Sequence, residues 1–220
     1  ELADKGACTG NCLTGKGTLV YGDGTTYTGS FKNGFFHGQG KMTWTTVGDS
    51  FEGRWENDDY ADGLYKYEDG SSYKGTFKMR YYSGKGTYLK GDQKWVGEWN
   101  DGNAHGEMVV EFRDRNEEIT KISGHWENHL ISGKCIITNG KDRIEGTLQH
   151  IANEGNDTVD YAGKVTWYKE DGTKYVGEVR TFSAAIGGVF SLACYGEGVL
   201  YDKSGKVLKS GRFNEGPNPD

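Results

Sequence analysis

A short pattern recurs along almost the whole chain: an aromatic or aliphatic residue, then a glycine, then another apolar residue, each two positions apart. The aligned copies are Tyr27-Gly29-Phe31, Phe51-Gly53-Trp55, Tyr73-Gly75-Phe77, Trp95-Gly97-Trp99, Ile122-Gly124-Trp126, Ile144-Gly146-Leu148 and Tyr175-Gly177-Val179. Successive copies start about 23 residues apart, and a period of this size indicates a small supersecondary unit that stacks on its neighbours. This repeat constrains the fold more than any other feature.

The alternation within each copy predicts β-strands. Residues at spacing two share one face of a strand, so Tyr27, Gly29 and Phe31 point one way while Thr28 and Ser30 point the other. Asn-Gly and Asp-Gly pairs follow the copies and supply the positive φ angles that hairpin turns require. The 36 glycines, and the placement of both prolines near the end of the chain, agree with many tight turns. We therefore expect an all-β fold in which helix is rare.

A single hairpin is marginally stable, so the hairpins must stack. We expect a single-layer antiparallel sheet of stacked β-hairpins, a twisted open solenoid with one aromatic face and one charged face. Residues 1–12 form an N-terminal segment or cap, 13–213 hold about seven repeats with insertions after residue 112, and 214–220 form a tail. The apolar stretch 181–195 is expected to cap this end of the sheet, and self-association is its alternative role.

The consensus Tyr-x-Gly-x-Phe/Trp-x-Asn-Gly-x3-Gly-x-Gly resembles the MORN (membrane occupation and recognition nexus) repeat family over about residues 13–213. The resemblance implies a single-layer sheet curved into a trough. The sequence departs from the consensus in its second half, where Ile122 and Ile144 replace tyrosines and Cys135 replaces a glycine. The family name implies phospholipid binding, and such arrays also occur beside lipid-kinase and methyltransferase domains.

The segment GNCLTGKGT at residues 10–18 comes close to a phosphate-binding loop. That loop needs Ser or Thr directly after Gly-Lys to hold Mg²⁺, whereas Gly17 stands there. The Gly-Lys pair of Gly15 and Lys16 also recurs at the same phase of later repeats, so it belongs to the repeat. No nucleophile and base occur in a recognisable catalytic frame. The chain is predicted not to be an enzyme and to need no cofactor.

Metal-binding patterns are incomplete. His125 and His129 lie four apart, but Trp126 stands where the zinc-protease motif needs Glu. The run 56–62 places three aspartates together in what we expect to be a solvated turn between hairpins. We predict no metal site.

Cys8 and Cys12 form the one close cysteine pair, without the second pair or the histidines of a zinc site. The alternatives are a local disulfide, which fits an oxidising compartment, and two free thiols in a turn. The localisation is unknown, and a bonded pair would favour an exported, periplasmic or extracellular chain.

The net charge of −6 is spread along both halves. A nucleic-acid partner is excluded because no basic stripe exists, and an anionic membrane surface would on average repel the chain. No apolar run reaches the roughly 20 residues of a membrane-spanning helix.

The aromatic face is the remaining candidate site. Its rings are Tyr27, Phe31, Phe51, Trp55, Tyr73, Phe77, Trp95, Trp99 and Trp126. Most of them are expected to pack on one another as the core, while a single layer leaves the face partly open as a groove. The predicted function is a non-catalytic scaffold that binds a protein or peptide partner, or a second copy, through this groove or its terminal strands. The alternatives are a phospholipid or membrane-surface module and a regulatory or targeting arm of an enzyme complex.

Overall fold

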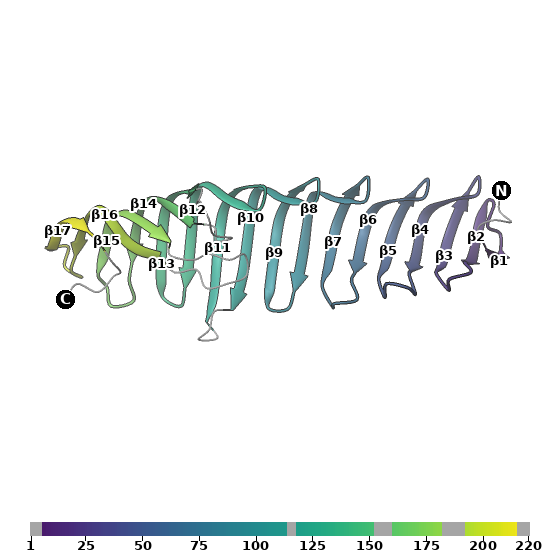
Figure 1. The fold of residues 1–220 in the computed structure, drawn as a ribbon, viewed down its shortest axis with the longest axis horizontal. Helices are drawn as coiled ribbons and strands as arrows, with labels where there is room; N and C mark the ends of the chain where they lie inside the picture. Colours follow the sequence, from purple (N-terminus) through teal and green to yellow (C-terminus); the bar gives the residue numbers. More distant parts are fainter. Residues whose placement is uncertain (1–5, 114–117, 152–159, 182–191, 215–220) are drawn as a thin grey trace. The chain divides into compact units, whose positions relative to one another are not determined.

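The computed structural model describes residues 6–113, 118–151, 160–181 and 192–214. These residues form β-strands joined by turns and contain no helix, which confirms the all-β fold (Figure 1). The chain divides into two compact units, Glu1–Asn103 and Ala104–Asp220. Of the apolar stretch expected to cap the trough, residues 182–191 lie outside the described residues, and Leu192–Tyr201 is a strand.

Unit one is an antiparallel meander in which every strand pairs with the next along the chain (Figure 1). Its strands are β1 (Ala7–Gly10), β2 (Gly15–Val20), β3 (Thr26–Lys32), β4 (Phe35–Thr43), β5 (Ser50–Glu56), β6 (Asp59–Lys66), β7 (Ser72–Lys78), β8 (Tyr81–Lys90) and β9 (Gln93–Asn100). The predicted stacking of β-hairpins is confirmed.

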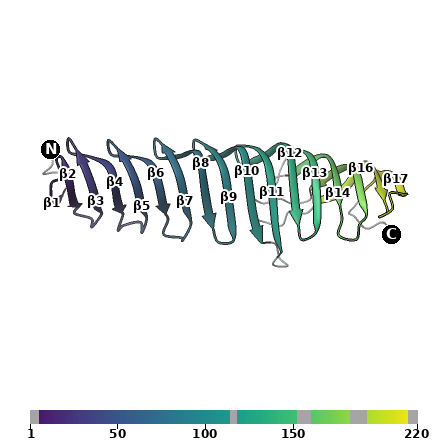
Figure 2. The same cartoon turned by 180° about the vertical axis from the view of Figure 1, so that it is seen from behind.

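Unit two has the same organisation, as Figure 2 shows from behind. Its strands are β10 (Asn103–Arg113), β11 (Ile119–Glu127), β12 (Leu130–Asn139), β13 (Asp142–Ile151), β14 (Asp160–Tyr168), β15 (Lys174–Thr181), β16 (Leu192–Tyr201) and β17 (Val207–Phe213). The repeats of the second half depart from the consensus sequence but keep the hairpin arrangement of the first half.

The middle glycine of the repeat forms an unbroken row across unit one. In strand order, from β2 to β9, the paired residues are Gly17, Gly29, Gly40, Gly53, Gly63, Gly75, Gly86 and Gly97. A Cβ atom on Gly53 would lie 2.5 Å from the Cα atom of Gly63, so neighbouring strands approach too closely for any side chain. In unit two Cys135 takes the place of a glycine, between Gly124 and Gly146.

The hairpin turns at one edge of unit one have two residues with positive φ, as type I′ turns require. Asn33 and Gly34 have φ of 53° and 78°, and Gly34 N–H donates to the carbonyl of Leu13 at 2.9 Å, which ties this hairpin to the preceding one. In a later turn Met79 and Arg80 adopt φ of 50° and 68° without any glycine. This last turn is strained, since side chains other than Gly, Asn and Asp rarely adopt the left-handed region.

The prediction that the three aspartates of the acidic run at 56–62 lie together in one turn is wrong. Only Asp58 of its three aspartates lies in a turn, because β6 already begins at Asp59. The Asp58 carboxylate accepts the main-chain N–H of Phe36 at 2.6 Å, and Asp62 pairs with Arg54 at 2.6 Å. The carboxylates are thus used in holding neighbouring strands together.

Candidate functional site

The nine predicted site rings form the core of their units. None of them is more than 8% exposed: Tyr27 0%, Phe31 4%, Phe51 0%, Trp55 1%, Tyr73 0%, Phe77 8%, Trp95 5%, Trp99 5% and Trp126 4%. Their faces are covered by one another and by neighbouring rings, as where Tyr27 stacks on Phe36 with centroids 3.9 Å apart. This burial agrees with the expectation that most of these rings pack together as the core, and a binding role for them stays a prediction.

Three tyrosines of the repeat share one further arrangement. Tyr27 folds over the glycine row, and its hydroxyl donates to the carbonyl of Ser30 at 2.8 Å. A Cβ atom on Gly40 would lie only 2.3 Å from the Tyr27 Oη atom, so the ring occupies the space that the missing side chain leaves. The hydroxyls of Tyr73 and Tyr175 likewise donate to the main-chain carbonyl three residues further along the chain, at 3.2 Å and 2.7 Å. Burial raises the pKa of Tyr27 to about 12, with a smaller contribution from Asp58.

Among the partly exposed rings of unit one, three occupy equivalent positions in successive hairpins. Tyr21, Trp44 and Tyr67 follow the last residues of β2, β4 and β6, at the ends opposite the type I′ turns, and each is partly exposed. We call them the ring row. In all three the main-chain N–H donates across to the start of the next strand, and the carbonyl accepts from the glycine of the turn. These partners are Thr25 and Gly24 for Tyr21, Asp49 and Gly48 for Trp44, and Ser71 and Gly70 for Tyr67.

Hydrogen bonds join the three turns of the ring row to one another. The Thr45 hydroxyl donates to the carbonyl of Gly24 at 2.8 Å, linking the second turn to the first. The main-chain N–H of Glu68 donates to the Asp49 carboxylate at 3.0 Å, linking the third turn to the second. The ring row is therefore held in place before any partner arrives.

Half-buried rings contact two members of the ring row. Trp44 stacks on Tyr65 with centroids 5.6 Å apart, and Tyr65 contacts Tyr67 at 4.6 Å. The Tyr67 hydroxyl is hydrogen-bonded to that of Tyr82. Burial raises the pKa of Tyr67, and that of Tyr21 with the help of Asp58 and Asp23, so both phenols are hydrogen-bond donors at neutral pH.

The turns around the ring row are acidic. Asp23, Asp49, Glu68 and Asp69 lie in or beside them, and we call this set the acidic rim. Hydrogen bonds from the Ser71 hydroxyl and N–H lower the pKa of Asp69, helped by Lys90, whose Nζ lies 3.3 Å from the carboxylate. Asp69 is therefore charged at neutral pH.

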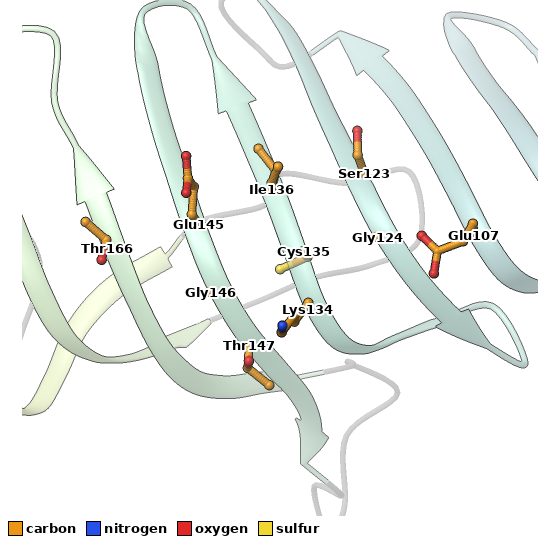
Figure 3. Close-up of a pocket in the computed structure, with 10 residues that line it drawn as sticks. All are labelled: Glu107, Ser123, Gly124, Lys134, Cys135, Ile136, Glu145, Gly146, Thr147 and Thr166. Carbon is orange, nitrogen blue, oxygen red and sulfur yellow. The ribbon is translucent and has the colours of Figure 1, made fainter.

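A second feature lies on the outer face of unit two. It is an open depression of about 570 Å³, shown in Figure 3. Its lining is Glu107, Ser123, Gly124, Lys134, Cys135, Ile136, Glu145, Gly146, Thr147 and Thr166. The two carboxylates already have partners, because Glu145 pairs with Arg143 and Glu107 lies 3.3 Å from the His125 Nδ1 atom. An open depression with one aliphatic side chain and engaged carboxylates offers little to hold a small ligand.

The remaining predicted residues lie apart from the ring row. Cys8 and Cys12 are joined by a disulfide at the β1 end of unit one. His125 lies in β11 beside Glu107, whereas the Nδ1 atom of His129 faces the main-chain N–H of Ala104 at 3.4 Å, so the two histidines do not face a common point. Among the residues that the structure describes, no group of three His, Cys, Asp or Glu side chains is placed to hold a metal ion.

The ring row was missed from the sequence although a signal for it exists. The segments YGDG at 21–24 and YEDG at 67–70 are turn patterns that begin with the aromatic residue in question. Trp44 does not fit this sequence pattern, because its turn is one residue longer than the turns of Tyr21 and Tyr67. In unit two the same turn geometry carries Lys169 and Asp202 in place of rings, so the described row is confined to unit one.

A meander of stacked hairpins with an aromatic core defines a β-hairpin repeat protein. The MORN repeat model matches residues 13–26, 27–46 and 95–107. The chain therefore contains MORN repeats, which confirms the family indicated by the sequence pattern. No curated protein matches the chain.

MORN repeats suggest a repeat-based interaction or membrane-binding module, and the MORN repeat family is generally not catalytic. In the described part of the chain, no helix has the length and apolar character needed to cross a membrane.

Proposed function

We propose that this protein is a non-catalytic interaction module that binds a segment of a protein partner on the ring row of unit one. The observation that carries the proposal is the recurrence of one partly exposed ring at the same turn of three successive hairpins, Tyr21, Trp44 and Tyr67. The nine buried rings then act as the scaffold that positions this row.

The physical properties of the row suit binding. Trp and Tyr dominate the energetic centres of protein interfaces because they offer a large contact area and lose little side-chain entropy. The turn-to-turn hydrogen bonds of Thr45 and Glu68 fix the backbone under the rings, which reduces the ordering cost on association.

A phospholipid surface is a weaker candidate for the same site. The acidic rim would face the headgroups, and carboxylates are repelled by anionic lipids. A protein segment can instead bring basic side chains to these carboxylates. Nothing on the ring row favours a role as an enzyme's regulatory arm over a role as a free-standing module.

A pull-down from the native source, with chemical crosslinking and mass spectrometry, tests this function. Trp44→Ala is the test bait, and Tyr168→Ala is the control because Tyr168 is a 44% exposed ring in unit two. Partners retained by the wild type and by Tyr168→Ala but lost by Trp44→Ala support the proposal. Partners captured equally by both variants contradict it, as does strong, salt-sensitive co-sedimentation with anionic liposomes that Trp44→Ala abolishes.

A further inference from the structure

We propose that the partner segment is a proline-rich stretch in the polyproline II conformation that carries basic residues and lies across the ring row. This inference rests on the proposed function, because it names the chemistry of the partner at the same site. Three properties of the ring row carry it: the spacing of the rings, their unused donors and the charge of the acidic rim.

The spacing comes from the strand pairing. Tyr21, Trp44 and Tyr67 belong to successive hairpins, so two strand intervals separate each ring from the next. Two intervals amount to about 9.6 Å. A polyproline II helix has three residues per turn and rises about 3.1 Å per residue, so the same face returns every ~9.3 Å. Each turn of such a segment would therefore meet one ring of the row.

Other regular conformations fit this spacing less well. In an extended strand, residues three apart span about 10 Å but point to opposite faces, so alternate rings would meet no side chain. In an α-helix the face returns after seven residues, or about 10.5 Å, which drifts by nearly 2 Å over the two intervals. Polyproline II keeps its register with all three rings.

Donors on the row complement the polyproline II backbone. The carbonyls of that backbone make no internal hydrogen bonds and are open to outside donors. The Trp44 indole N–H makes no hydrogen bond to any residue within the described ranges. The Tyr67 and Tyr82 hydroxyls have two hydrogens and use one in their mutual bond, which leaves one to donate. Aromatic rings with such donors are the usual surface for proline-rich segments.

The acidic rim sets the charge of the partner. Asp23, Asp49 and Glu68 make no ion pair with any residue that the structure describes, while Asp69 is paired with Lys90. Three carboxylates without counter-charges lie along the same turns as the three rings. A segment with one basic residue per turn would place its charges on the rim while its prolines face the rings.

Isothermal titration calorimetry with synthetic peptides tests the inference on the full chain. The probe is a nine-residue peptide of three Lys-Pro-Pro triplets, about 28 Å long as polyproline II. Its controls are Lys-Gly-Gly triplets, which keep the charge, and Glu-Pro-Pro triplets, which keep the conformation. We expect the probe to bind at least about tenfold more tightly than either control. We also expect Trp44→Ala to weaken it at least about tenfold and Tyr168→Ala to leave it unchanged.

Two results would overturn the inference: equal affinity for the Lys-Pro-Pro and Lys-Gly-Gly peptides, and unchanged affinity in a Trp44→Ala variant that retains its circular dichroism spectrum. Selection from a random peptide library then separates this failure from failure of the proposed function. If selected peptides depend on Trp44 but lack proline, the function stands and the polyproline II partner is rejected. If no selected peptide depends on Trp44, both are rejected.

Discussion

Substitution of Gly40 by Ala tests how the aromatic core depends on the glycine row. Gly40 lies in β4 under the ring of Tyr27, which is 0% exposed. An added Cβ atom would lie 2.3 Å from the Tyr27 Oη atom, 2.5 Å from Cζ and 2.6 Å from Cε2. Ordinary contacts of a Cβ atom begin near 3.4 Å, so the ring would have to withdraw by about 1 Å.

The ring has little room to withdraw. It is stacked on Phe36 at 3.9 Å and packed edge-on against Trp55 at 5.3 Å, and its hydroxyl is bonded to Ser30. Overpacking of a core costs about 1–3 kcal/mol, and a lost hydrogen bond costs about 1 kcal/mol. We therefore expect Gly40→Ala to lower the free energy of unfolding by about 2–4 kcal/mol.

Urea denaturation followed by tryptophan fluorescence measures this loss. Gly22→Ala is the matched control, because Gly22 has an ordinary φ and a Cβ atom there would meet nothing within 4 Å. The control should change stability by less than about 0.5 kcal/mol. A Gly40→Ala protein as stable as the wild type, or a control equally destabilised, would refute the reasoning.

Four further predictions follow from the same contacts. Replacing Cys8 and Cys12 together by Ser should lower the free energy of unfolding by about 2 kcal/mol, because the disulfide closes a short loop. A reductant should lower the free energy of unfolding of the wild type and leave that of the double variant unchanged. Urea titrations in which the reductant destabilises both proteins equally would contradict this. Trp55→Ala should cost at least about 3 kcal/mol in the same titration, because Trp55 is 1% exposed; a loss below 1 kcal/mol would argue against its place in the core. The pKa of Tyr27 in the folded protein lies above the unfolded value of 10.0. The stabilisation of the folded state that comes from its protonated hydroxyl is therefore complete below pH 10 and is lost as pH rises towards 12. Between pH 10 and pH 12 the stability of Tyr27→Phe should therefore fall by about 2 kcal/mol less than that of the wild type, and parallel alkaline curves would reject this assignment. Met79→Asn should raise stability by about 0.5–1 kcal/mol by relieving a positive φ, and a lower melting temperature would show that the turn is not strained.

The fold could be predicted from the sequence because every copy of the repeat has the same alternation of apolar residues and glycine. Tyr27, Gly29 and Phe31 alternate at the period of a strand, and Asn33 with Gly34 supplies the turn that returns the chain. The same rule failed at 56–62, where a cluster of acidic residues was interpreted as a turn. Residue type alone did not show that Asp62 lies opposite Arg54 across a strand pair.

The candidate site could be predicted only in part. The repeat pattern identified the inward rings correctly, but exposure depends on how far the sheet and its tyrosines close over the glycine row. That closure is a tertiary property, set by contacts such as Tyr27 against Gly40 and Phe36. The ring row follows from a different signal, the aromatic residue that opens each turn, as at Tyr21 and Tyr67.

The most direct test of the central claim is an NMR titration of the protein with the Lys-Pro-Pro peptide, observed at the six tryptophan indole N–H groups. Trp55 and Trp99 are each 5% exposed or less, and their indole groups donate to Gly40 and Gly86 at 3.1 Å and 3.3 Å. We predict that the Trp44 signal shifts on titration while these two signals stay in place. Shifts at Trp55 and Trp99 with an unchanged Trp44 signal would contradict the account, because the partner would then occupy the inner aromatic face.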